Sequence, residues 1–170
     1  GKTMLETGAC WNWSLEKCRR LIRNIEGEQL FAERCADPRG LILLLPHLCT
    51  WEMLHSVLTA HTHFIAMYKP SKIRPLDVWM QAVRNRSSAT MVPANRRGVT
   101  ELVKTLKAGG CIVMLPDQEP ERESGDFAPF FGVETLTVSL VHGLATKTNA
   151  QLLLINAKRL PDGGGFDVVF

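Results

Sequence analysis

Long apolar runs are missing from this 170-residue sequence. The longest uninterrupted one extends from Leu41 to Pro46, whereas a helix that crosses a membrane needs roughly 20 apolar residues. No basic and then apolar signal segment opens the chain. Because 45% of the residues are hydrophobic and 22% are charged, the composition is typical of a globular domain and excludes a largely disordered chain. We expect one domain that is soluble or, at most, peripheral to a membrane.

Paired cysteines and the common cofactor motifs are missing as well. The cysteines are odd in number and none has Cys-x-x-Cys spacing, which favours reduced core thiols in a cytoplasmic setting; they are Cys10, Cys18, Cys35, Cys49 and Cys111. There is no Gly-x-Ser-x-Gly elbow, glycine-rich phosphate loop or dinucleotide fingerprint. His55, His61 and His63 have no companion zinc-binding pattern. We therefore expect no metal ion and no cofactor.

Charge is distributed unevenly along the chain. The formal net charge is only +3, yet the segment from Lys69 to Lys107 contains nine basic and two acidic residues. A basic half of this kind favours anionic partners such as phosphorylated lipid, nucleic acid or an acidic carrier protein. For any single lysine, a solvated helix face is the simpler interpretation.

Apolar stretches of strand length alternate with amphipathic stretches of helix length. Ser14 is expected to cap the first helix and Gly27 to end it. We expect helices at about 15–26, 28–36, 50–60, 74–85, 98–108 and 136–148, strands at 41–45, 63–68, 89–92, 111–115, 151–157 and from 166, and a loop over 117–133. The alternation predicts an α/β fold with a layered, largely parallel sheet flanked by helices, and a terminal hairpin around the turn from Pro161 to Gly165.

His47 and Glu52 follow the most apolar of the expected strands. In open α/β sheets, functional residues gather at the carboxyl ends of the strands. A carboxylate on one ring nitrogen of a histidine fixes its tautomer and leaves the other nitrogen to take a proton from a hydroxyl group. The pair thus indicates base chemistry suited to acyl transfer from a thioester to an alcohol. The spacing alone leaves open that His47 is a structural histidine.

Several short motifs, taken in order, resemble one enzyme family. Pro46-His-Leu-Cys-Thr-Trp-Glu-Met53 is similar to the His-x4-Asp/Glu motif of the lysophospholipid acyltransferase superfamily, in the Trp-Glu form of its lipid A branch. Further segments resemble motifs of that branch: Tyr68-Lys-Pro70, Arg84-Asn-Arg86, Leu115-Pro-Asp-Gln-Glu-Pro120 and the stretch from Phe127 to Thr137. Over nearly its whole length, the chain resembles the bacterial lipid A biosynthesis acyltransferases.

The resemblance implies roles for individual residues. His47 is expected to be the general base and Glu52 its orienting partner, while Arg84, Arg86 and Asp117 are expected to bind substrate. The residues themselves leave alternatives open. Arg84 is either a bidentate phosphate clamp or a solvated arginine on a helix face, and Asp117 is either part of the site or a loop cap on buried amides.

Three aromatic residues in the expected loop are further candidates. Phe130 and Phe131, with Phe127 nearby, are expected to contact substrate by lining an acyl-chain groove. The same residues are equally suited to entering a bilayer interface, where aromatic side chains are favoured. Plugging the core is the third interpretation.

The resemblance also implies a function and a location. It implies transfer of a fatty acyl chain from acyl carrier protein to a hydroxyl of a phosphorylated glycolipid, a lipid A precursor, at the membrane surface on the cytoplasmic face of the inner membrane, with no nucleic acid partner. We expect residues 1–170 to be a single catalytic domain cut at both ends, without a membrane anchor or carboxyl-terminal helices. One alternative is an acyltransferase acting on glycerophospholipid or another glycolipid. The other is a non-catalytic module that binds anionic lipid.

Overall fold

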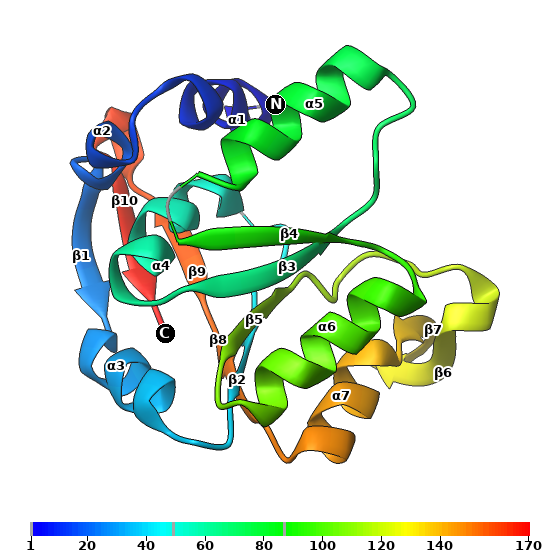
Figure 1. Ribbon diagram of the computed structural model, residues 1–170. Helices are drawn as coiled ribbons and strands as arrows, with labels where there is room; N and C mark the ends of the chain where they lie inside the picture. The colour runs from blue at the N-terminus through cyan, green and yellow to red at the C-terminus, as the bar shows by residue number, and fades with distance from the viewer. Residues whose placement is uncertain (1, 49, 87) are drawn as a thin grey trace.

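The computed structural model describes residues 2–48, 50–86 and 88–170. A five-stranded sheet in the order β4-β3-β5-β2-β8 forms its centre, and every neighbouring pair of strands is parallel (Figure 1). The strands are β2 (Leu41–Leu44), β3 (Phe64–Tyr68), β4 (Ala89–Pro93), β5 (Cys111–Met114) and β8 (Gln151–Leu154). The predicted α/β fold with a largely parallel sheet is therefore confirmed.

Helices cover both faces of this sheet, which explains why its inner strands are apolar along their whole length. One face is covered by α6 (Arg96–Lys107) and α7 (Leu140–Thr148) (Figure 1). These helices pack Leu102, Leu106 and Leu144 against Ile42 and Ile112. The other face is covered by α3 (Glu28–Ala36), the short 3₁₀ helix η1 (Trp51–Leu54) and α4 (His55–His61), together with a second sheet. The helix expected over 50–60 is thus η1 followed by α4.

The second sheet has three strands in the order β1-β10-β9: β1 (Ile22–Glu26), β10 (Phe166–Val169) and β9 (Asn156–Arg159). Strands β9 and β10 are antiparallel and are joined across the short 3₁₀ turn η3 (Pro161–Gly163), which confirms the terminal hairpin. The strand expected over 151–157 is divided between the two sheets as β8 and β9. Ile155, between them, is fully buried.

The helix expected over 15–26 is wrong in its second half. Helix α2 (Leu15–Arg19) begins at the predicted cap, where the Ser14 hydroxyl accepts from the Lys17 amide at 3.1 Å, but the chain then forms strand β1. Strand β1 pairs in parallel with β10, and this long-range pairing overrides the helical spacing of the apolar residues. Gly27, at φ +80°, precedes α3 and does not end a helix.

The loop expected over 117–133 and the helix expected from 136 also need correction. The short 3₁₀ helix η2 (Arg122–Ser124) leads into an antiparallel hairpin of β6 (Gly125–Phe130) and β7 (Val133–Val138). β-branched residues at alternate positions of β7 favour a strand over a helix. Helix α7 therefore begins only at Leu140.

The remaining helices are α1 (Lys2–Asn12), which was not expected, and α5 (Arg74–Arg84), which ends one residue before its predicted bound. None of the helices in the described part of the chain is long and apolar enough to span a membrane. Cys10, Cys18 and Cys111 are buried, Cys35 is half-buried, and all four are free thiols as expected. Cys49 lies outside the described residues.

Candidate functional site

His47 and Asp117 meet at the carboxyl edge of the central sheet. His47 follows β2 and Asp117 follows β5, and these two strands are direct neighbours. The Asp117 carboxylate accepts from the His47 backbone amide at 2.6 Å and lies 2.8 Å from the ring Nδ1. The arrangement is the one expected for loops that follow adjacent parallel strands. One carboxylate thereby fixes both the backbone and the ring of His47.

The contact with Asp117 determines which ring nitrogen of His47 is available for chemistry. A carboxylate facing Nδ1 selects the tautomer that donates from Nδ1, which leaves the lone pair on Nε2. The Gln118 amide nitrogen lies 3.3 Å from Nε2. Partial burial raises the pKa of Asp117, but its hydrogen bonds with His47 outweigh burial and hold the pKa below its ordinary value. Asp117 is therefore ionised at neutral pH, as an orienting carboxylate must be.

In the part of the chain that the structure describes, Glu52 makes no hydrogen bond or ion pair with His47. Because η1 turns it into the protein, its side chain is only 5% exposed, and its carboxylate accepts from the Arg84 guanidinium at 2.8 Å. Arg84 lies at the end of α5 and is 19% exposed. The predicted Glu52 contact with the ring is thus replaced by Asp117, and Glu52 instead forms a nearly buried ion pair.

Two tryptophans connect this ion pair to the histidine. The Arg84 guanidinium carbon lies 5.4 Å from the Trp11 ring centre and 5.3 Å from that of Trp51, within cation–π range. Trp51 in turn packs edge-on against the His47 ring, with 5.9 Å between ring centres. The Glu52–Arg84 pair therefore holds one wall of the space around the imidazole.

We expect loss of either partner of this ion pair to be strongly destabilising, because it leaves the other charge buried and uncompensated. Arg84→Ala should lower the free energy of unfolding by about 3–5 kcal/mol. Arg84→Lys keeps the charge but loses the planar contacts to both tryptophans, so its loss should be intermediate. Denaturant titration measures both variants. Lys104→Ala removes an exposed Lys104–Glu101 pair and should cost no more than about 1 kcal/mol. Equal losses for the buried and the exposed pair would contradict this interpretation.

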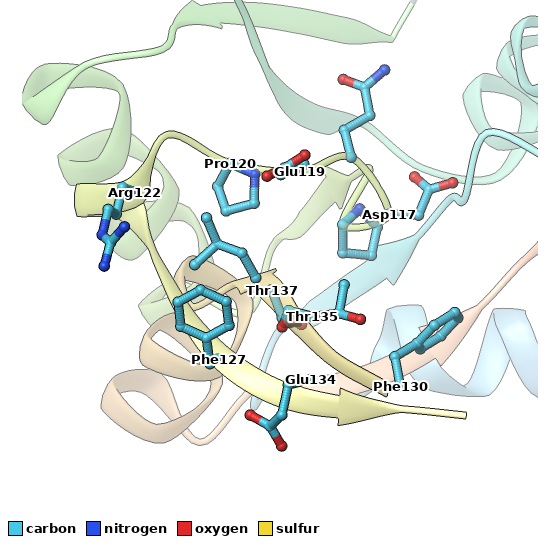
Figure 2. Close-up of a pocket in the computed structure, with 12 residues that line it drawn as sticks. Asp117, Glu119, Pro120, Arg122, Phe127, Phe130, Glu134, Thr135 and Thr137 are labelled. Carbon is cyan, nitrogen blue, oxygen red and sulfur yellow. Dashed lines mark hydrogen bonds between the residues drawn. The ribbon is translucent and has the colours of Figure 1, made fainter. Parts of the chain in front are cut away.

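A groove of about 860 Å³ extends from the Asp117 loop to the β6–β7 hairpin. Asp117 and Glu119 lie along one side, while Phe127, Phe130 and Thr135 come from the hairpin on the other side (Figure 2). The lining combines apolar rings with threonine hydroxyls and charged side chains, a mixture suited to an amphiphilic ligand. His47 does not itself line this groove but contacts Asp117 and Gln118, which do.

The other residues predicted to bind substrate have different positions. Phe131 occupies the turn of the hairpin, 93% exposed and outside the groove lining. Arg86 donates to the backbone carbonyls of Cys10 and Trp13 at 2.6 and 2.8 Å, so it ties the end of α1 to the domain. The structure therefore brings Asp117 and Phe130 to the groove and directs the two arginines inward.

Sequence reasoning did not select Gln118 or Trp51 as site residues. Each is next to a selected residue, Gln118 after Asp117 and Trp51 before Glu52. Adjacency to a strand-end acid was the available signal for Gln118. Nothing in the sequence indicated that Trp51 would contact both His47 and Arg84, because that contact depends on the turn made by η1.

His55 has a perturbed titration close to the ion pair. Burial is the main cause that lowers the pKa of His55 to about 4; a contact with the Arg86 carbonyl opposes this shift, and the positive charges of Arg86 and Arg84 add to it. Because the unfolded chain then binds more protons, stability should fall as the pH drops from about 6.5 towards 4. His55→Gln should flatten this part of a melting-temperature profile, whereas His63→Gln, at an exposed position, should not. An unchanged slope in His55→Gln would refute the assignment.

The known proteins that this chain resembles in sequence are acyltransferases. The chain is 29% identical over 171 residues to the lipid A biosynthesis lauroyltransferase of Escherichia coli K12, covering 99% of this chain and 55% of that protein. It is 26% identical over 167 residues to the palmitoleoyltransferase of the same strain, covering 98% and 54%. A lipid A biosynthesis acyltransferase of Haemophilus influenzae is 28% identical over 171 residues, with coverage of 99% and 53%.

The family follows from a match along the whole chain. The family model described as bacterial lipid A biosynthesis acyltransferase matches residues 1–170. The chain therefore belongs to the bacterial lipid A biosynthesis acyltransferase family. It spans about half the length of the relatives that it matches.

Proposed function

We propose that this chain carries the catalytic centre of an acyltransferase that esterifies a hydroxyl of a lipid A precursor, with His47 as the general base. The observation that carries the proposal is the 2.8 Å contact between Asp117 and the His47 Nδ1, which leaves Nε2 with a lone pair beside an amphiphilic groove. Base catalysis requires a nitrogen in this state within reach of the substrate proton.

The chemistry proceeds in two proton-balanced steps. The acceptor hydroxyl gives its proton to His47 Nε2 as its oxygen bonds to the carbonyl carbon of an acyl thioester, forming a tetrahedral oxyanion. The oxyanion then collapses, the carbon–sulfur bond breaks, and the imidazolium returns the proton to the departing thiolate. Asp117 stabilises the imidazolium between these steps, as the acid of a Ser-His-Asp triad does. The Gln118 amide must leave Nε2 when the hydroxyl binds.

Glu52 acts on this centre indirectly in our proposal. Its carboxylate holds Arg84, and Arg84 supports Trp51 against the His47 ring. Glu52 is therefore a positioning residue, which differs from the direct dyad expected from the sequence. Arg84 and Arg86 serve the site through their protein contacts, and Phe130 serves it as part of the groove wall.

The donor, acceptor and location in this proposal rest on the family and on charge. The relatives are named for lipid A biosynthesis and for transfer of lauroyl or palmitoleoyl groups. We propose acyl carrier protein as the donor, because the basic segment from Lys69 to Lys107 complements an acidic carrier. The phosphates of the acceptor favour the same positive field. The cytoplasmic face of the inner membrane is the proposed location.

A comparison of substrates with the full-length natural protein tests these assignments. Acyl carrier protein and coenzyme A thioesters of the same chain are supplied in turn, each with a phosphorylated lipid A precursor or a lysoglycerophospholipid, and products are identified by mass spectrometry. We expect the carrier thioester and the lipid A precursor to be used with the highest kcat/KM. Preference for the glycerolipid would support the alternative acceptor. Absence of transfer in every combination, by protein that binds anionic lipid, would identify a binding module.

A further inference from the structure

Helix α5 carries an apolar face that the described part of the chain leaves largely exposed, with only Trp79 packed against a neighbouring ring. None of its residues is buried. Val78 is 61% exposed and Trp79 is 40% exposed, and Ile73, just before the helix, is 62% exposed. Pro75, Val78, Trp79 and Ala82 are all exposed and recur at helical spacing, so they form one stripe. A stripe of this kind requires an apolar partner or an interface.

Helix α1 extends the same surface. Trp11 of α1 packs edge-on against Trp79 of α5, with ring centres 5.2 Å apart, so the two helices lie side by side (Figure 1). Met4 lies two helical turns before Trp11 on the same face of α1 and is 80% exposed. We call the combined surface the α1–α5 face; its exposed apolar residues are Met4, Ile73, Val78 and Trp79.

The charges around this face are positive. Lys2 begins α1, Lys72 lies just before α5, and Arg74 begins α5. All three are exposed, at the helix ends near the apolar residues. Each helix contains a single acidic residue, and both are engaged within the protein. Glu6 binds Arg159 and Thr50, and Asp77 accepts from the Ser71 amide at 2.8 Å and from the Gln81 side chain at 2.7 Å. An apolar face with a basic border complements an anionic lipid surface.

The face is also continuous with the candidate site. The last residue of α5, Arg84, binds Glu52 and contacts both Trp11 and Trp51, and Trp51 packs on the His47 ring. A surface that rests on lipid here would bring the site beside a bilayer. An amphiphilic acceptor could then move to His47 with a short displacement out of the membrane.

We propose that the α1–α5 face is the surface by which this domain rests on the interface of an anionic bilayer, with Trp79 at headgroup level and the apolar stripe below it. The inference rests on the proposed function, which requires an acceptor held in a membrane, and adds the surface that meets it. Aromatic residues at an interface and lysines at the anionic surface are the known preferences that it uses.

Fluorescence quenching tests the contact without depending on activity. The full-length protein is reconstituted with vesicles of phosphatidylethanolamine and phosphatidylglycerol at a 3:1 ratio, with and without brominated acyl chains. The Trp79 signal is taken as the difference between the wild type and Trp79→Phe. We expect brominated lipid to quench this difference signal and aqueous acrylamide to quench it less. Quenching by acrylamide but not by brominated lipid would overturn the proposal, and so would resistance to both quenchers, which would show that another segment or a second copy covers the face.

Activity provides the matched test. Ile73→Glu combined with Val78→Glu should reduce transfer to acceptor embedded in these vesicles by about tenfold or more, the factor expected when two apolar side chains are withheld from lipid. Transfer to detergent-dispersed acceptor should be unchanged. Leu152→Glu with Leu154→Glu alters exposed leucines on β8, away from the face, and should affect neither assay. Equal loss in both acceptor forms would overturn the proposal, whereas a wild type inactive in both would refute the proposed function and leave the quenching result to decide the surface.

Discussion

His47→Ala should lower turnover by roughly 10²- to 10⁴-fold, the usual contribution of a positioned general base. The replacement removes the imidazole, whose Nε2 keeps a lone pair beside the groove while Asp117 contacts its Nδ1. No other group in the described part of the site combines these two features. Raising the pH should not restore activity, because an alcohol ionises far above any usable pH. The rate is measured with saturating carrier thioester and detergent-dispersed acceptor.

Folding and binding are the controls for this variant. His47 is at the surface of a strand end, so the melting temperature of His47→Ala should change little, and acceptor binding should remain close to that of the wild type. His63→Ala changes an exposed histidine outside the site and should retain full turnover. Near wild-type turnover in folded His47→Ala would return His47 to the role of a structural histidine.

Asp117→Asn should be almost as damaging as loss of the histidine. An amide can donate to Nδ1, which favours the tautomer whose proton lies on Nε2 and so removes the base. The corresponding change in a Ser-His-Asp protease lowers kcat by roughly 10⁴-fold. Because Asp117 also accepts from the His47 backbone amide, the asparagine oxygen can preserve that bond and the loop with it. We therefore expect a large loss of turnover in a protein that still folds.

Asp126→Asn is the matched control for Asp117→Asn, since Asp126 is an exposed aspartate in β6, outside the groove lining. It should leave turnover unchanged. The pH dependence provides a second check. The pKa of Asp117 is held below its ordinary value by His47, so protonation of this carboxylate should diminish activity only in strongly acidic solution. Turnover in Asp117→Asn comparable to that of Asp126→Asn would exclude Asp117 from the catalytic group.

The central sheet was predictable because its signals are local. Leu41 to Leu45 is apolar throughout, and a run of that length is typical of a strand buried on both faces. Strand β1 was missed for the opposite reason. Ile22 and Ile25 satisfy helical spacing, and the strand exists because β10, more than 140 residues later, offers its edge. Single-sequence periodicity contains no information about that pairing.

The candidate site was likewise predictable in part from the sequence. The sequence indicated both His47 and Asp117, because each follows a strand and strand ends gather at one edge. It also assigned Glu52 as the ring's partner, on the resemblance of this segment to a His-x4-Asp/Glu motif. Adjacency in a parallel sheet depends on strand order, and β2 and β5 are neighbours. Glu52 is directed inward by η1 and meets Arg84 there.

A double-mutant cycle in single-turnover acyl transfer tests the central claim most directly. Rates are measured for the wild type, His47→Ala, Asp117→Asn, Glu52→Gln, and the combinations of His47→Ala with each acid variant. If His47 and Asp117 act as one unit, adding Asp117→Asn to His47→Ala should cause scarcely any further loss, because the effects of residues that work together do not add. Glu52→Gln alone should lower stability as well as rate. Losses for His47 and Asp117 that simply multiply would contradict the account.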